Sequence, residues 1–316
     1  MAASPKTLLT IGKRDVAVTN LDKVLWPKDG YTKGDLIAYY RAVAPVLLPH
    51  IAGRPLTLER YPNGITGEGW WEKSVPKGAP PWVNTVTVDA STRAGGLTFV
   101  VCDDEATLAY VANLAAIVLH VWYSRVPTLD VPDFILIDLD PWEGCTIATL
   151  ARVALAVREE LTNIGVTPLV KTTGGSGLHV VVPLEPQYDW DVAKGFAELI
   201  ARRTHDVLPK ETTLERTTAK RPAGSVYLDY VQVGKGKTYV APFSVRPRDG
   251  APVSMPIAWA EVEKMRRKRA KETMTEMLRW TIANVPALVA KHGDAWSEGW
   301  TPHNLENAIS RARSLW

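Results

Sequence analysis

An apolar run that ends in two aspartates constrains this chain more than any other feature. The run is Phe134-Ile-Leu-Ile-Asp-Leu-Asp140, and alternate residues of a strand point to the same face, so Asp138 and Asp140 should project together. Two adjacent carboxylates are costly to keep ionised beside an apolar strand unless a cation balances them. The run therefore predicts a strand end that binds a divalent cation, with an ordinary strand end turning at Pro141 as the open alternative.

A third carboxylate closes a second strand-like run, Ser225-Val-Tyr-Leu-Asp229. Together with Asp138 and Asp140 it would complete an oxygen ligand set for magnesium or manganese. A phosphoryl-transfer site of this kind holds its ions about 3.5–4 Å apart when two bind.

Composition limits the class of protein. The chain has 316 residues and 46% hydrophobic content, enough for one large or two modest domains. Cys102 and Cys145 are isolated from each other, which argues against a disulfide framework or zinc site and favours a reduced, cytoplasmic compartment. The first residues lack a signal-peptide core, and the apolar stretch 106–123 is expected to be a buried helix rather than a membrane span. A net charge of +3 does not by itself establish a nucleic-acid partner.

Periodicity predicts a mixture of helices and strands. Helices are expected over 33–48, 106–123, 147–161 and 192–207, and strands over 56–60, 85–89, 134–140, 168–172, 179–183, 226–231 and 239–242. This order indicates an α+β fold with mixed sheets flanked by helices. We expect an N-terminal part over 1–105, a core over 106–257 and a C-terminal helical segment over 258–316, forming one compact domain.

Several polar clusters lie between these elements. Thr172-Thr-Gly-Gly-Ser-Gly-Leu-His179 could turn its amides inward around an anion, although a plain tight turn is the default for such a loop. Ala241-Pro-Phe-Ser-Val-Arg-Pro-Arg248 offers two guanidiniums for phosphate, or a surface ion pair. Thr32 and Asp35 form a capping box that puts Lys33 on the first turn of a helix, a plausible phosphate pocket with Lys23 nearby. The cationic run 264–271 fits either a solvated helix face or a phosphate contact.

Taken in order, these motifs resemble the polymerase domain of bacterial DNA ligase D, of the archaeo-eukaryotic primase superfamily. The resemblance is carried by Asp138-Leu-Asp-Pro, the glycine loop 172–180, Tyr227-Leu-Asp-Tyr-Val-Gln232 and Ala241-Pro-Phe-Ser-Val-Arg246. It extends to Asn20-Leu-Asp-Lys-Val-Leu-Trp-Pro27, Thr32-Lys33, His50-Ile-Ala-Gly-Arg-Pro55, Arg60-Tyr-Pro-Asn-Gly64 and Trp70-Trp-Glu-Lys73, so it covers nearly the whole chain.

The resemblance implies a primase-polymerase core and a role for each matching position. Asp138, Asp140 and Asp229 match the metal-binding, catalytic carboxylates, which implies manganese or magnesium, two ions, and a nucleoside triphosphate substrate. Positions around the nucleotide are matched by His120, Thr173, Ser176, Gly177, His179, Gln232, Lys237 and Arg246. Asn20, Lys23 and Lys33 match a pocket for the 5′-phosphate of a DNA gap or break, and Trp70 and Trp71 match residues that stack on template bases.

The chain departs from the family pattern at a few points. Ser176 stands where many members have lysine, which removes one cation from the triphosphate site, and Val233 stands where asparagine is common. The ligase and nuclease domains that usually share the polypeptide are absent from these residues, so the chain is expected to be a stand-alone homologue or an excised domain.

We therefore expect a template-directed nucleotidyltransferase that extends DNA 3′ ends and fills short gaps, with ribonucleotides favoured, during non-homologous end joining or gap repair. DNA with gaps or 5′-phosphorylated broken ends is the expected partner, together with a Ku-like protein and a DNA ligase, at the nucleoid and not at a membrane. A non-catalytic DNA-end adaptor is the alternative that the aspartate triad disfavours. A metal-dependent phosphoesterase would need a water-activating arrangement that the sequence does not show.

Overall fold

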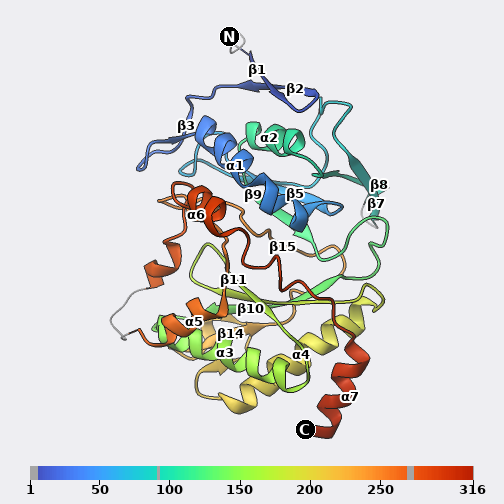
Figure 1. Ribbon diagram of the computed structural model, residues 1–316, viewed down its shortest axis with the longest axis vertical. Helices are drawn as coiled ribbons and strands as arrows, with labels where there is room; N and C mark the ends of the chain where they lie inside the picture. The colour runs from blue at the N-terminus through green and yellow to red at the C-terminus, as the bar shows by residue number, and fades with distance from the viewer. Residues whose placement is uncertain (1–5, 91–92, 269–273, 316) are drawn as a thin grey trace. The chain divides into compact units, whose positions relative to one another are not determined.

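The computed structural model describes residues 6–90, 93–268 and 274–315 (Figure 1). The chain forms two compact units, each built from separate stretches of sequence. The first unit comprises Met1–Pro127, Thr238–Ser254 and Trp280–Gly293, and the second comprises Thr128–Lys237, Met255–Arg279 and Asp294–Trp316. The predicted division at residues 105 and 257 stays a prediction. No helix in the described ranges is long and apolar enough to cross a membrane.

The first unit is built on an antiparallel sheet of order β15-β9-β5-β8-β7, with β6 paired to the free part of β5. A hairpin of β1 and β2 and a short β3–β4 pair accompany it. Its elements are β1 (Lys6–Ile11), β2 (Arg14–Thr19), β3 (Val24–Trp26), β4 (Tyr31–Thr32), α1 (Lys33–Ile51), β5 (Pro55–Arg60), β6 (Trp70–Glu72), β7 (Thr85–Ala90), β8 (Arg93–Val101), α2 (Glu105–Asn113), β9 (Ala116–Trp122), β15 (Thr238–Val240) and α6 (Val285–His292).

The second unit is built on a sheet of order β13-β14-β10-β12-β11-β16, in which only β13 and β14 run parallel. Helices α3 and α4 pack on its central strands. Its elements are β10 (Phe134–Pro141), α3 (Ile147–Asn163), β11 (Leu169–Thr172), β12 (Leu178–Pro183), α4 (Trp190–Val207), β13 (Thr212–Thr213), η1 (Thr218–Lys220), β14 (Val226–Asp229), β16 (Pro256–Ile257), α5 (Trp259–Arg266), η2 (Met274–Leu278) and α7 (Leu305–Leu315). The predicted α+β class with a mixed sheet is confirmed.

Local chemistry explains where the first long helix begins. The Thr32 hydroxyl accepts a hydrogen bond from the Asp35 amide, and the Asp35 carboxylate accepts one from the Thr32 amide. This reciprocal capping box satisfies amides that the first helical turn cannot pair, so α1 starts at Lys33 as predicted. Pro27 and the turn before Tyr31 keep the preceding residues out of the helix.

The helix predicted over residues 106–123 is confirmed only as far as Asn113, and its second half is wrong. Helix α2 ends at Asn113, Ala115 adopts a left-handed backbone with φ of 55°, and the chain continues as the strand β9. Every residue of β9 is buried because β15 and β5 pair with its two edges and both of its faces are covered. A strand buried on both faces shows no alternation, so its apolar run cannot be told from a buried helix by periodicity. The β-branched residues of β9 fit the strand that its neighbours require.

A buried tyrosine joins three segments of the first unit. Tyr40 on α1 donates its hydroxyl hydrogen to the Ile117 carbonyl at 2.7 Å, and the Val245 amide donates to the same hydroxyl at 3.2 Å. Ser244 lies 3.4 Å from that hydroxyl and accepts a hydrogen bond from the Leu119 amide at 2.8 Å. The network therefore holds the segment after β15 against β9 and α1.

Tyr40→Phe should destabilise the fold by about 1–3 kcal/mol, because the buried Val245 amide and Ile117 carbonyl each lose a hydrogen bond. Urea unfolding of the purified protein measures the loss. Tyr31→Phe is the matched control, since the Tyr31 hydroxyl makes no hydrogen bond to any described residue; it should change the stability by less than about 0.5 kcal/mol. Equal effects of the two changes would contradict a structural role for the Tyr40 hydroxyl.

Candidate active site

Strand pairing brings the three predicted metal-binding aspartates together in the second unit. Asp138 on β10 lies directly opposite Asp229 on β14, and Asp140 lies opposite Tyr227. Leu139, between the two β10 aspartates, is fully buried, whereas Asp138 and Asp140 are partly exposed. The alternation places Asp138 and Asp140 on one face of the sheet, as their spacing predicted, and the β10–β14 register adds Asp229 to that face.

This carboxylate group carries strong internal repulsion. Burial and, after it, the charges of Asp138 and Asp229 together raise the pKa of Asp140 to about 7, against the opposing charge of Arg221. Within the described ranges, no three His, Cys, Asp or Glu side chains are grouped to hold a metal ion as they stand. A divalent cation is nevertheless the counter-charge that such a set of hard oxygen donors would accept, because it would relieve the repulsion that the Asp140 pKa records.

Two neighbours hold the carboxylates from either side. Asp229 accepts hydrogen bonds from the Val231 amide and from Nε2 of Gln232, both at 2.9 Å. Nε2 of His179, on β12, lies 3.4 Å from Oδ1 of Asp138, its direct cross-strand partner. The structure thus brings the predicted nucleotide residues Gln232 and His179 beside the predicted metal ligands.

The glycine loop lies against the same strand. The amides of Gly175 and Gly177 donate to the Thr173 hydroxyl at 3.1 and 3.2 Å, so these two amides turn toward Thr173 instead of outward around an anion. A Cβ on Gly177 would lie 2.6 Å from the carbonyl oxygen of Leu139, so only glycine allows this approach. The loop is therefore fixed beside the carboxylates, and Ser176 is exposed at its tip.

Basic residues that the sequence analysis did not select lie close to this group. The Arg221 guanidinium is 3.9 Å from the Tyr227 ring centroid and 5.7 Å from that of Trp142. Burial lowers the pKa of Lys237; the Asp229 charge opposes this, and the charges of Lys194 and Arg216 reinforce it. These cations come from α4 and from loops, without a common motif, so only the folded chain assembles them.

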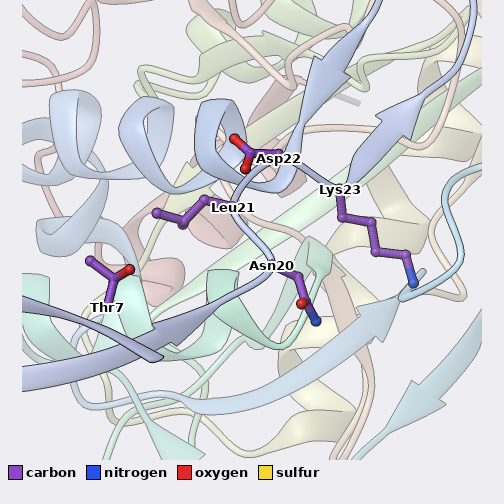
Figure 2. A pocket seen from close by; sticks show the side chains of 5 residues that line it. All are labelled: Thr7, Asn20, Leu21, Asp22 and Lys23. Carbon is purple, nitrogen blue, oxygen red and sulfur yellow. The ribbon is translucent and has the colours of Figure 1, made fainter. Parts of the chain in front are cut away.

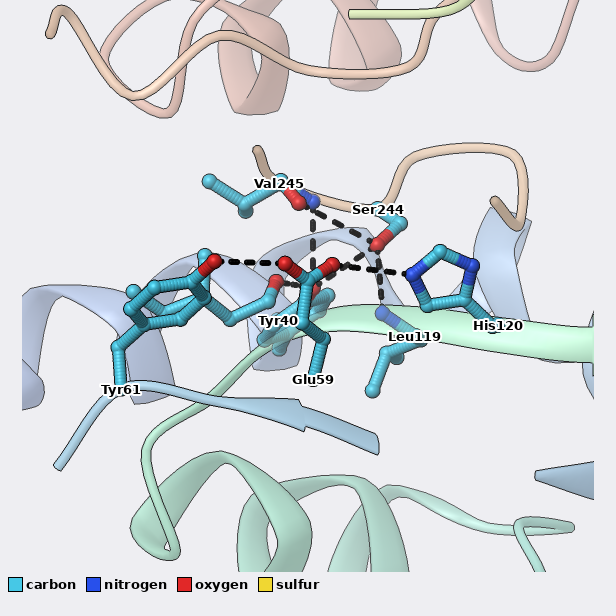
Figure 3. Close-up of polar contacts among 8 residues, drawn as sticks. Tyr40, Glu59, Tyr61, Leu119, His120, Ser244 and Val245 are labelled. Atoms are coloured by element: carbon cyan, nitrogen blue, oxygen red, sulfur yellow. Dashed lines mark hydrogen bonds and ion pairs between the residues drawn. The ribbon is translucent and has the colours of Figure 1, made fainter. Parts of the chain in front are cut away.

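The first unit holds the other predicted nucleotide residues, His120 and Arg246. Nε2 of His120 lies 3.1 Å from Oε2 of Glu59, whose Oε1 accepts a hydrogen bond from the Tyr61 hydroxyl at 2.6 Å (Figure 3). The Arg246 charge lowers the pKa values of both Glu59 and Tyr61, which places its guanidinium near this cluster. Sequence reasoning missed Glu59 and Tyr61 because the contact of Glu59 with His120 depends on strand register, and Tyr61 joins the cluster only through Glu59.

Two of the three predicted 5′-phosphate residues, Asn20 and Lys23, line an open pocket of about 600 Å³ in the first unit (Figure 2). The pocket is lined by Thr7, Asn20, Leu21, Asp22 and Lys23. Lys33 is not part of that lining. It is buried and donates to the Thr19 hydroxyl at 3.3 Å, and burial, reinforced by the nearby Lys23 charge, lowers its pKa to about 8.

The first backbone amides of α1, beside this pocket, are already hydrogen-bonded within the protein. The Lys33 and Gly34 amides donate to the carbonyl oxygens of Lys23 and Leu21, each at 2.8 Å, and the capping box occupies the Asp35 amide. Any phosphate bound here would therefore be recognised by the lysine ammonium groups and Asn20, not by free amides of the helix N-terminus.

The two predicted stacking residues are exposed on β6. Trp70 is 43% exposed, and Cζ of the Arg60 guanidinium lies 5.0 Å from the centroid of the Trp70 ring. Trp71 is 53% exposed, and its ring centroid lies 4.2 Å from that of His120. Large aromatic rings held at the surface by Arg60 and His120 are available for stacking with a base.

The cationic run 264–271 is described only as far as residue 268. On α5, Lys264 pairs with Glu261 and Arg266 pairs with Glu263, and Lys268 pairs with Glu276. The described part of the run therefore has the ion pairs of a solvated helix face, which was one of the two interpretations.

Comparison with known proteins gives consistent relatives. Residues 32–296 match the protein family described as LigD, primase-polymerase domain. The chain is 38% identical over 274 residues to the multifunctional non-homologous end joining protein LigD of Mycobacterium bovis, covering 84% of this chain and 36% of that protein. It is 32% identical over 246 residues to the bifunctional non-homologous end joining protein LigD of Bacillus subtilis, covering 78% of this chain and 39% of that protein. The chain thus spans about a third of the length of these relatives.

A solved structure is also similar. It is the polymerase domain from Mycobacterium tuberculosis ligase D in complex with DNA, with a TM-score of 0.81 and 36% sequence identity. The match covers 90% of this chain and 97% of that one. The similarity therefore extends to the arrangement of nearly all elements of that domain.

With metal ions removed by EDTA, the free energy of unfolding should depend on pH through the titration of Asp140. Between about pH 4 and 7 its folded-state carboxyl, with a pKa of about 7, keeps a proton that the unfolded chain has released, so stability falls as pH rises through this window. Asp140→Asn lacks this titration. Its stability relative to the wild type should therefore increase from about pH 5 to pH 8, as measured by urea unfolding with EDTA.

The control for that experiment is Asp206→Asn, which changes an exposed aspartate on α4. A stability difference between Asp140→Asn and the wild type that stayed constant from acid to neutral pH would contradict the raised pKa of Asp140.

Proposed function

Because the chain belongs to the LigD primase-polymerase domain family, we propose that it is a metal-dependent nucleotidyltransferase that adds nucleotides to a DNA 3′ end. The observation that carries this proposal is the carboxylate group Asp138, Asp140 and Asp229 on one sheet face, with the Asp140 pKa raised by burial and by its two neighbours. Such a group suits transfer of a nucleotidyl group from a nucleoside triphosphate to the primer 3′-hydroxyl, with pyrophosphate as the leaving group.

Asp138, Asp140 and Asp229 would hold the ions, manganese or magnesium, with two ions as the proposed number. When bound, the ions supply Lewis-acid stabilisation of the charge on the reacting phosphate and on the primer 3′-oxygen. The protein supplies the positions of the carboxylates: Gln232 and the Val231 amide fix Asp229, and His179 faces Asp138. No side chain is needed as a covalent nucleophile.

The nucleotide would be contacted in the second unit by Thr173, Ser176, Gly177, His179, Gln232 and Lys237. In the first unit, His120 and Arg246 are the proposed contacts. The Thr173 hydroxyl oxygen accepts hydrogen bonds from two loop amides, so the hydroxyl hydrogen would donate to a phosphate oxygen. With serine at 176, Lys237 and the neighbouring cations would supply the positive charge of this part of the site.

DNA is the proposed partner, and a relative solved in complex with DNA supports it. We propose that Asn20, Lys23 and Lys33 bind the 5′-phosphate of a gap or broken end and that Trp70 and Trp71 stack on template bases. On the pattern of the relatives, whose names specify non-homologous end joining, the chain would fill short gaps at breaks in the bacterial nucleoid. Ribonucleotides are the proposed substrates, with a DNA ligase and a Ku-like protein as functional partners.

Asp138→Ala should abolish primer extension, since it removes the carboxylate at the centre of the group, while leaving DNA binding largely intact. Extension of a labelled primer on gapped DNA with manganese and either ribonucleotides or deoxyribonucleotides measures the first effect, and a gel-shift titration measures the second. Asp206→Ala, an exposed change on α4, is the control and should extend normally. Undiminished extension by Asp138→Ala would refute the site, and a wild type that binds gaps but never extends them would favour a DNA-end adaptor.

Lys23→Ala combined with Lys33→Ala should remove the preference for gaps with a downstream 5′-phosphate over gaps with a hydroxyl. The preference of the wild type should also weaken as pH rises above about 8, because Lys33, with its pKa lowered to about 8, loses its charge there. Competition binding between the two DNAs measures both effects. Lys291→Ala, an exposed lysine on α6, serves as the control. A preference unchanged in the double variant would refute this pocket.

A further inference from the structure

The clearest arrangement that the proposed chemistry does not yet use is the buried pair of Glu59 and His120. The two residues lie on the adjacent antiparallel strands β5 and β9, where Thr57 faces His120 and Glu59 faces Val118. Glu59 and His120 are therefore diagonal neighbours on one face of the sheet. Their side chains are only 13% and 7% exposed, so their contact is largely shielded from water.

Two contacts, one at each carboxylate oxygen, fix Glu59 in place. Oε1 accepts the Tyr61 hydroxyl at 2.6 Å, and Oε2 lies 3.1 Å from Nε2 of His120, as Figure 3 shows. Gly69 leaves room for the Tyr61 ring, because a Cβ at that position would lie 2.4 Å from it. The carboxylate therefore has one orientation, with one oxygen committed to the histidine.

The Glu59 carboxylate determines the tautomer of His120. Burial alone would raise the pKa of Glu59, but the hydrogen bonds from His120 and Tyr61 and the charge of Arg246 outweigh it, so the pKa lies below its usual value and Glu59 is ionised. An ionised carboxylate only accepts hydrogen bonds, so Nε2 must be protonated. A neutral His120 would then have an unprotonated Nδ1, which cannot donate to a phosphate; donation from Nδ1 requires the imidazolium.

The surroundings of the pair favour that imidazolium. An adjacent carboxylate stabilises the charged ring, and the Trp71 ring, 4.2 Å from that of His120 between centroids, adds a cation–π contribution. The other titratable groups of the cluster do not change charge near neutrality. Burial raises the pKa values of Tyr40 and Tyr61 to about 12, with the Glu59 hydrogen bond adding to the second, and Arg246 remains a cation.

We infer that Glu59 is a positioning residue for His120: it binds Nε2, orients the ring and stabilises the imidazolium that recognises a phosphate of the bound nucleotide. This inference rests on the proposed function, in which His120 contacts the nucleotide. It also makes one carboxylate responsible for the pH range in which the first unit recognises phosphate. The negative charge of Glu59 is compatible with a nearby phosphate because it stabilises the positive charge of the His120 ring.

The test combines NMR and binding on the full chain. The chain has six histidines, so ¹⁵N-labelled imidazole spectra, assigned with His120→Gln, report the pKa and tautomer of His120 directly. In Glu59→Gln the His120 pKa should fall by about one unit or more, and the strict Nε2–H tautomer of the neutral ring should be lost. Tyr61→Phe keeps the charge of Glu59 but removes one hydrogen bond to its carboxylate, so the His120 pKa should fall by a smaller amount.

Affinity for nucleotide should follow the same titration. With ATP and manganese, Glu59→Gln should bind up to about tenfold more weakly near pH 7 and like the wild type near pH 5.5, where both rings are protonated. Inorganic tripolyphosphate should show the same difference, since the contact is to phosphate. Glu105→Gln is the matched control: it removes a carboxylate of the first unit that pairs with Arg41, and it should leave both measurements unchanged.

An unchanged His120 pKa in a folded Glu59→Gln variant, or equal or tighter nucleotide binding near pH 7, would overturn the inference. Neither measurement requires turnover. If the wild type failed to extend primers, the proposed function would fall, while the NMR titration and the tripolyphosphate binding would still decide whether Glu59 controls phosphate recognition by His120.

Discussion

The pairing of β10 with one strand on each side is the constraint on which the candidate site depends. Because β12 and β14 are both in register with Asp138, the backbone ladder places His179 and Asp229 beside it without any loop being involved. Sites built on paired strands are held to small tolerances, since a shift of one residue would turn every side chain to the other face. Gly177, which allows the glycine loop to approach the Leu139 carbonyl, ties a second group of predicted ligands to the same strand.

Charge is balanced differently in the two units. The second unit gathers three carboxylates on one sheet face, and burial together with the charges of Asp138 and Asp229 raises the pKa of Asp140. The first unit instead surrounds one carboxylate, Glu59, with donors from His120 and Tyr61 and with the Arg246 charge, and its pKa falls. The first arrangement would accept a divalent cation, whereas the second is already balanced and would act by orienting its histidine.

A buried hydroxyl network supports that second arrangement. Tyr40 and Ser244 fix the segment that carries Arg246 against β9, the strand that carries His120. These bonds are buried, so they determine the position of the backbone more strictly than surface contacts would. The exposed Trp71 then covers His120 from the solvent side. Packing, hydrogen bonding and stacking thus act on the same imidazole.

The sequence by itself determined the carboxylate strand, the capped helix α1, the glycine loop and the family resemblance, because each depends on residues close together in the chain. It could not distinguish β9 from a helix, since a strand buried on both faces has no alternation. It also could not find Glu59, Tyr61 or Arg221, whose partners are set by strand register and by loops that return from distant parts of the chain. Tertiary structure decided those contacts because hydrogen bonds and charge interactions act over a few ångströms of space, irrespective of separation in sequence.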